Sequence, residues 1–141
     1  MKKIIFCGFL LLAVACDNND HPGPDGCPIN IACTDVYVAV AVNIKNQHGN
    51  PYVLDEYYTT KLATGEKLPI QGNGSDPAGI KSGAYLVFRD TQLRFTSRQG
   101  EDFEFTGKKN GAVVVQKTFK IGHDCCHVKL LSGDPDIVVT E

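Results

Sequence analysis

Four cysteines limit how this chain can fold more than any other feature does. Cys27 and Cys33 lie near its beginning, whereas Cys125 and Cys126 are adjacent near its end. Adjacent Cα atoms lie about 3.8 Å apart across a trans peptide, but a disulfide ordinarily needs roughly 4.4–6.8 Å. A bond between Cys125 and Cys126 would therefore be strained. If the thiols are oxidised, each adjacent cysteine is expected to bond to an early one.

The first 15 residues indicate that the thiols are oxidised, because they resemble a secretory signal. Lys2 and Lys3 precede an apolar run over residues 4–14, and the small residue Ala15 follows. This order is typical of a signal peptide, and the run is shorter than the roughly 20 apolar residues of a spanning helix. Export leads to an oxidising compartment, where an even number of cysteines predicts disulfides.

The residues before the expected cleavage site, LAVAC at 12–16, resemble a bacterial lipobox. The resemblance implies that Cys16 is lipidated and becomes the mature N-terminus, which would attach the protein to a membrane. The alternative is an ordinary cleavage near Ala15, which would leave Cys16 as a free thiol. Cys7 lies inside the leader, so four of the six cysteines remain for disulfides.

Residues 16–32 are expected to comprise the lipidated cysteine and a flexible tether. The stretch at 17–26, DNNDHPGPDG, is polar, acidic and rich in Pro and Gly, so it cannot bury enough apolar surface to order itself. Acidic residues at this place resemble export signals of surface lipoproteins in Bacteroides-like bacteria; the alternative is that they only keep the segment soluble. We therefore expect attachment to the outer membrane, on its periplasmic or its surface face.

The charge of the chain argues against nucleic acid as a partner. The net charge is −2, from 14 basic and 16 acidic residues, and becomes −4 when Lys2 and Lys3 leave with the leader. No basic patch is evident. Residues 33–141 are enough for one domain with one hydrophobic core.

The domain at 33–141 is predicted to be all-β. Residues 34–45 alternate between apolar and polar or small side chains, as a strand with one buried face does. Further candidate strands lie at 52–62, 84–90, 91–97, 101–107, 112–121 and 123–131, the last of which is one strand or two half-strands, and the tail after them could add an edge. Asn110-Gly111 is a strong hairpin signal. About seven short strands separated by turns predict an antiparallel β-sandwich, Ig-like in architecture.

Residues 123–127, HDCCH, also carry atoms that bind metals. His123, Cys125, Cys126 and His127, which we call the HDCCH cluster, could supply four ligands. Structural zinc sites, however, usually separate their cysteines by two to four residues, and adjacent strand residues point to opposite faces. A catalytic dithiol would prefer the Cys-x-x-Cys spacing. We therefore expect disulfides here and no bound metal, with His123 and His127 as the remaining metal candidates.

The predicted pairing is Cys33–Cys125 and Cys27–Cys126. If the strand at 34–45 extends back to Cys33, that side chain faces away from the valine stripe. On a continuous final strand, Cys125 likewise faces away from the apolar side chains of that strand. The opposite pairing remains the alternative.

Tyr57 and Tyr58 are the other candidate binding residues. They are adjacent in the strand expected at 52–62, so one should enter the core while the other is available to a glycan or a protein. The Gly-rich stretch at 72–79 lacks the context of a nucleophile elbow or phosphate loop and the aspartate spacing of a calcium loop. No catalytic residue is identified, and we expect neither enzyme activity nor a cofactor.

Three stretches resemble known families. Residues 38–52, VAVAVNIKNQHGNPY, and 83–90, GAYLVFRD, resemble strands of carboxypeptidase regulatory-like domains, which have a transthyretin-like sandwich. The ending at 122–127, GHDCCH, is similar to that of small lipoproteins from Bacteroides-like bacteria. Carboxypeptidase regulatory-like domains are usually accessory modules without catalytic residues. The resemblance therefore implies a transthyretin-like fold and a supporting role.

Together these observations predict a non-enzymatic envelope lipoprotein that binds or scaffolds an envelope protein partner at the outer membrane. One alternative is a small metal-binding or redox protein that uses the HDCCH cluster. Another is a glycan-binding module that uses Tyr57 or Tyr58.

Overall fold

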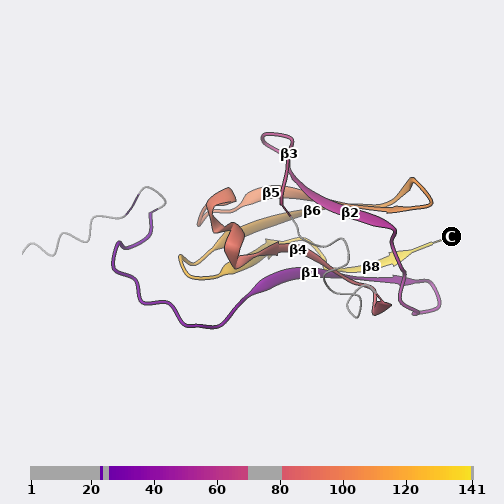
Figure 1. Cartoon of the computed structure of the whole chain (residues 1–141), viewed down its shortest axis with the longest axis horizontal. Coiled ribbons are helices and arrows are strands. Elements are labelled where there is room, and N and C mark those ends of the chain that lie inside the picture. Colours follow the sequence, from indigo (N-terminus) through magenta and orange to yellow (C-terminus); the bar gives the residue numbers. More distant parts are fainter. Residues whose placement is uncertain (1–22, 24–25, 70–80, 141) are drawn as a thin grey trace, which may run out of the picture.

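Two β-sheets face each other in the computed structural model, which describes residue 23, residues 26–69 and residues 81–140 (Figure 1). The smaller sheet has the strand order β4–β1–β8, with bounds Ala84–Arg89, Ala39–Asn46 and Asp136–Val139. The larger sheet has the order β3–β2–β5–β6–β7, with bounds Glu66–Lys67, Glu56–Lys61, Glu101–Lys109, Ala112–His123 and Val128–Ser132. A 3-10 helix, η1, covers Asp90–Phe95.

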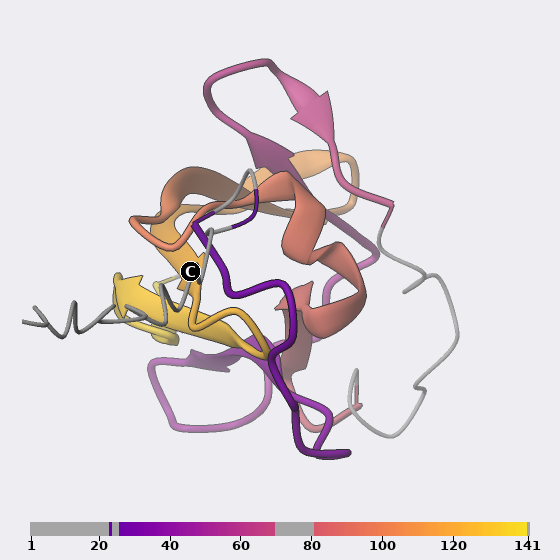
Figure 2. The same cartoon turned by 90° about the vertical axis from the view of Figure 1, so that its left-hand side faces the viewer.

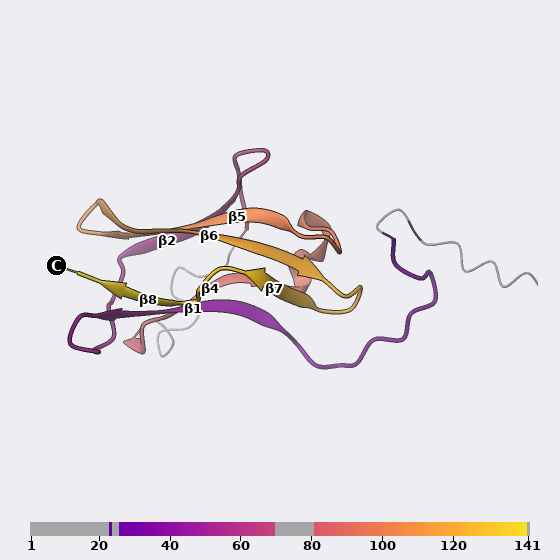
Figure 3. The ribbon, with the colours of Figure 1, turned by 180° about the vertical axis from the view of Figure 1, so that it is seen from behind.

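This arrangement confirms the predicted all-β sandwich. Neighbouring strands are antiparallel with one exception, since β8 pairs in parallel with β1 over Asn43–Asn46 and Asp136–Val139. Figure 3, a view from behind, shows β8 lying beside β1. The C-terminal tail therefore does add a strand to the edge of a sheet, as its sequence suggested.

The alternating stretch forms β1, but the strand starts later than expected. Val40, Val42 and Ile44 are buried while their neighbours are exposed, which confirms the one-sided pattern. The strand begins at Ala39 rather than at residue 34, and Val36 is 62% exposed although it shares the parity of the buried valines. Residues 34–38 leave the sheet and run along one end of the sandwich (Figure 1).

The β5–β6 hairpin forms where its turn residues predict it. Asn110 and Gly111 have φ values of 51° and 78°, the left-handed pair that a tight hairpin turn needs. Phe103 and Phe105 of β5 and Phe119 of β6 are fully buried. These rings, together with Val115, Ile121 and Val128, form the part of the core contributed by the larger sheet.

Two predicted strands differ in the structure. Residues 91–97 were expected to be a strand, but η1 occupies Asp90–Phe95. The Gln92 side chain accepts a hydrogen bond from the Arg89 amide (3.0 Å), which turns the chain as soon as β4 ends. The strand expected at 52–62 begins only at Glu56. Before it, the Tyr52 amide donates to the Ile44 carbonyl and the Leu54 amide to the Tyr85 hydroxyl, so these residues do not pair with β5.

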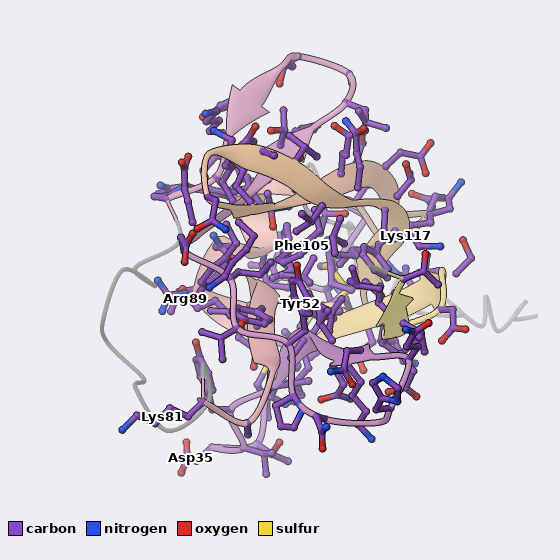
Figure 4. All side chains as sticks on the ribbon, turned by 90° about the vertical axis from the view of Figure 1, so that its right-hand side faces the viewer. Asp35, Tyr52, Lys81, Arg89, Phe105 and Lys117 are labelled. Atoms are coloured by element: carbon purple, nitrogen blue, oxygen red, sulfur yellow. A yellow bond between two sulfur atoms is a disulfide. The ribbon has the colours of Figure 1, made fainter. Side chains whose placement is uncertain are left out.

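Tyr85 holds this connecting segment against the core. Its hydroxyl accepts a hydrogen bond from the Leu54 amide (2.8 Å) and donates one to the Tyr52 carbonyl (2.9 Å). Its ring packs against Tyr57, with 5.0 Å between ring centroids. Burial raises the pKa of Tyr85, so its hydroxyl stays neutral. In Figure 4 the labelled Tyr52 and Phe105 lie among the crowded interior side chains, whereas Lys81 and Asp35 lie at the periphery.

Replacing Tyr85 with Phe is expected to lower the free energy of unfolding by about 1–2 kcal/mol, because the buried Leu54 amide loses its partner. Urea denaturation followed by circular dichroism measures the change. The same substitution at Tyr37, which is 59% exposed, is the matched control and should change the stability by less than about 0.5 kcal/mol. Equal effects at the two positions would contradict a special role for the Tyr85 hydroxyl.

Candidate functional site

The HDCCH residues form a turn between two strands rather than one continuous strand. β6 ends at His123 and β7 begins at Val128, so residues 124–127 connect them. The Asp124 carboxylate accepts hydrogen bonds from the amides of His127 (2.9 Å) and Cys126 (3.1 Å). Both hydrogen bonds lower the pKa of Asp124, and the one from His127 has the larger effect. Cys125 has a φ of 84°, in the left-handed region that residues other than glycine seldom occupy.

Cys27, Cys33, Cys125 and Cys126 all form disulfides, but the predicted pairing is wrong. The bonds are Cys27–Cys125, with 5.5 Å between Cα atoms, and Cys33–Cys126, with 5.3 Å. The prediction assumed that side chains alternate along an extended final strand. The left-handed backbone at Cys125 breaks that alternation, so strand parity does not decide which partner each cysteine faces.

The two disulfides lie at one end of the sandwich. Figure 2 faces this end, where the N-terminal segment (indigo) passes η1 and the β6–β7 turn. The segment is also held by the Arg98 guanidinium, which donates a hydrogen bond to the Gly26 carbonyl (3.0 Å). Three segments that are distant in the sequence therefore meet here.

Asp90 joins the same three segments without a covalent bond. One carboxylate oxygen accepts from the Val128 amide (2.8 Å), and the other accepts from the Val38 amide (2.8 Å) and lies 2.9 Å from His127 Nδ1. Burial disfavours the charged form, but the hydrogen bonds from His127, Val128 and Val38 outweigh it. The pKa of Asp90 is therefore lowered.

His127 extends this network to the N-terminal segment. Its Nε2 lies 3.0 Å from the Thr34 hydroxyl, while its Nδ1 faces Asp90. A hydroxyl, an imidazole and a carboxylate occur in the same order in hydrolase triads. Thr34, however, is exposed, whereas binding and catalytic sites lie in concave pockets. We interpret the network as a structural one that fixes the segment next to Cys33.

His123 belongs to a different group. The residue is 6% exposed, and its Nδ1 accepts a hydrogen bond from the Cys125 amide (3.0 Å) and lies 3.9 Å from Cys27 Sγ. The ligand atoms of Cys27, His123 and Cys125 all lie within 4.8 Å of one another. The HDCCH cluster is therefore divided: His123 and Cys125 gather with Cys27, while Cys126 and His127 contact other partners.

The two candidate tyrosines have separate surroundings. The ring of Tyr57 packs against Tyr85 and also lies near Phe105, with 5.9 Å between centroids. Lysine ammonium groups lie over the ring of Tyr58, Lys67 at 3.8 Å and Lys108 at 5.4 Å from its centroid. Tyr57 thus contributes to the core, and the Tyr58 ring contacts two lysines of its own sheet.

Several predicted features lie outside the described residues. These are the signal peptide, Cys16 and the first part of the tether, together with the Gly-rich stretch at 72–79. In the part of the chain that the structure describes, no helix is long and apolar enough to cross a membrane.

Comparison of the chain with protein-family models, curated proteins and solved structures found no match. Sequence reasoning identified the four bonded cysteines, Tyr57 and both histidines, but it missed Asp90 and Thr34. Asp90 directly follows β4, a place where polar side chains often end a strand; nothing in the sequence links it to His127, which lies 37 residues later.

Proposed function

We propose that the protein is a non-enzymatic lipoprotein of the cell envelope, anchored through Cys16, whose sandwich binds or scaffolds an envelope protein partner at the outer membrane. The observation that carries this proposal is the double attachment of residues 27–38, the first of which belong to the stretch that the sequence predicted to be a flexible tether. Cys27 and Cys33 both bond to the β6–β7 turn, and Asp90 holds the same segment by hydrogen bonds to Val38 and to His127.

This attachment suits a domain held by one lipid. Any force between the anchor and the domain passes first through Cys27, which is bonded to Cys125 beside the end of β6. β6 is a strand of 12 residues paired with β5 on one side and β7 on the other. The tether thus connects to the turn that joins β6, an interior strand of the larger sheet, to the edge strand β7.

The opposite end of the sandwich is where we place the partner. The turn after β1, residues 47–50, and the β5–β6 turn at Asn110 and Gly111 lie at the end far from the N-terminal segment (Figure 1). Both turns are exposed. A domain attached to the membrane at the disulfide end would present these turns outward, in the manner of the accessory modules that the sequence resembles.

Replacing Cys16 with Ala is expected to abolish lipidation and release the protein from the outer-membrane fraction. Expression in a Gram-negative host with a labelled fatty acid, followed by fractionation and intact mass, measures both effects. Cys7→Ala is the matched control, because it removes a cysteine of the predicted leader and should leave lipidation unchanged. Persistent lipidation of the Cys16→Ala variant would contradict the proposal that Cys16 carries the lipid anchor.

Crosslinking in whole cells tests the partner. The lipidated wild type should capture the same envelope protein repeatedly, and insertion of a bulky tag after Asn110 should reduce that capture. A tag after Gly65, in the exposed turn between β2 and β3, is the control away from the β5–β6 turn and should leave the capture intact. Capture that survives the tag at Asn110 would place the partner on another surface.

A further inference from the structure

The two disulfides differ in their surroundings. A buried imidazole stands beside Cys27–Cys125, with His123 Nδ1 only 3.9 Å from Cys27 Sγ. The imidazole nearest in sequence to the other disulfide is that of His127, whose two ring nitrogens face Asp90 and Thr34. Within the described residues, the group formed by Cys27, His123 and Cys125 is the one set of three metal-ligating side chains whose ligand atoms gather this closely.

The three side chains suit a thiophilic divalent metal. Because His123 Nδ1 accepts a hydrogen bond from the Cys125 amide, this nitrogen is unprotonated and its lone pair is directed at that amide, beside the two sulfurs. Zinc binds thiolate at about 2.3 Å and imidazole nitrogen at about 2.0–2.1 Å, so ligand atoms in a tetrahedral site lie roughly 3.5–3.8 Å apart. The separation of 3.9 Å between His123 Nδ1 and Cys27 Sγ is close to that range, and the two sulfurs must move apart once their bond is broken.

We propose that the Cys27–Cys125 disulfide, once reduced, forms with His123 a site for zinc or a similar metal ion. Two external thiol groups, such as those of two glutathione molecules, give two electrons and two protons to the disulfide and are themselves oxidised to a disulfide. Metal binding then releases the two thiol protons and leaves two thiolates and one imidazole on the ion, with the fourth position open to water. Disulfide and metal site exclude each other, and metal binding replaces the hydrogen bond from the Cys125 amide.

The second disulfide keeps the parts of this site together. In the Cys33–Cys126 disulfide, Cys126 is adjacent to Cys125 in the sequence, and Cys33 lies six residues after Cys27. Arg98 also holds the Gly26 carbonyl. Reduction of Cys27–Cys125 alone therefore leaves Cys27 close to His123. The proposal is independent of the lipid anchor and of the envelope partner.

The test is a redox titration of the mature chain carrying Cys16→Ala, with and without zinc, in a glutathione buffer. Alkylation and peptide mass spectrometry measure the reduced fraction of each cysteine, and native mass spectrometry counts the bound metal. Zinc should raise the ratio of reduced to oxidised Cys27–Cys125 at least about tenfold, with one ion per chain, and leave Cys33–Cys126 oxidised.

His123→Ala should remove this zinc effect. Loss of a residue that only supports a metal ligand lowers the affinity for the metal at least roughly tenfold, and loss of a ligand itself should lower it at least as much. His127→Ala is the matched control and should retain the effect. Cobalt in place of zinc should give the strong visible bands of tetrahedral thiolate coordination in the control and not in His123→Ala. Circular dichroism shows whether each variant is folded.

A zinc effect that is absent in the folded protein, equal at both disulfides, or unchanged in His123→Ala would overturn the proposal. If His123→Ala fails to fold, His123→Gln replaces it. That variant keeps a hydrogen-bond acceptor for the Cys125 amide but offers no imidazole, and persistence of the zinc effect in it would be equally decisive.

Discussion

Replacing all four bonded cysteines with serine is expected to lower the free energy of unfolding by about 7 kcal/mol, whereas removing either bond alone should cost only about 2.5 kcal/mol. The difference follows from the loops that the bonds close. Cys27–Cys125 and Cys33–Cys126 span 98 and 93 residues, and either one by itself closes a long loop, worth about 4.7 kcal/mol in the chain-entropy model.

Once one bond is present, the other closes only a small ring. That ring contains residues 27–33 and 125–126, about nine residues, for which the same model gives about 2.5 kcal/mol. The effects of the two bonds are therefore not additive. A domain of ordinary stability, about 5–15 kcal/mol, tolerates the loss of one bond, whereas the loss of both unfolds it if its stability lies at the lower end of this range.

Urea denaturation of the wild type, the two double variants and the quadruple variant measures this pattern. Cys27→Ser with Cys125→Ser and Cys33→Ser with Cys126→Ser should have similar stabilities, each well above that of the quadruple variant. If the losses of unfolding free energy in the two double variants add up to the loss in the quadruple variant, the second bond does not merely close a small ring, and the explanation above is wrong.

Asp90→Asn is expected to lower the stability by about 2–3 kcal/mol, because an amide keeps one acceptor oxygen but directs its NH₂ at groups that donate. In the wild type the two carboxylate oxygens face three donors, from Val38, Val128 and His127. Hydrogen bonds to charged groups contribute about 1.5–3 kcal/mol each, so the side chain is among the strongest polar connections in the described domain. Asp102→Asn, at an exposed position, is the control.

The pH dependence gives a second measurement of the same interaction. The pKa of Asp90 is lowered in the folded state, so its contribution is fully present above the ordinary aspartate value of 3.8 and is lost as pH falls through the lower folded value. The wild type should therefore lose stability more steeply than Asp90→Asn below about pH 4. Parallel acid-unfolding curves for the two proteins would show that Asp90 is not the group responsible.

Local signals predicted those parts of the fold that depend on neighbouring residues. The alternation in β1 depends on side-chain parity, and the β5–β6 turn depends on Asn110 and Gly111, which tolerate a left-handed backbone. η1 was missed because Leu93 and Phe95 fit a strand pattern as well as a turn. Gln92 favours the helix over the strand, because its side chain hydrogen-bonds to the Arg89 amide and the Pro69 carbonyl.

The site was less predictable because its contacts join distant parts of the chain. The cysteines could be identified by compartment and number, but their pairing depends on the positive φ of Cys125 and on the hydrogen bonds of Asp124. Likewise, the separation of His123 from His127 follows from the turn between β6 and β7. One continuous strand would instead place both histidines on the same face, because their positions differ by an even number of residues.

The connection between the two ends of the chain also determines when the domain can fold during synthesis. Cys27 and Cys33 are made more than 90 residues before their partners, and β8, the parallel neighbour of β1, is made last. The first two cysteines are thus available to bond with each other before Cys125 and Cys126 exist. Correct maturation then requires that such an early bond be exchanged, so we expect the yield of native protein to depend on a disulfide isomerase.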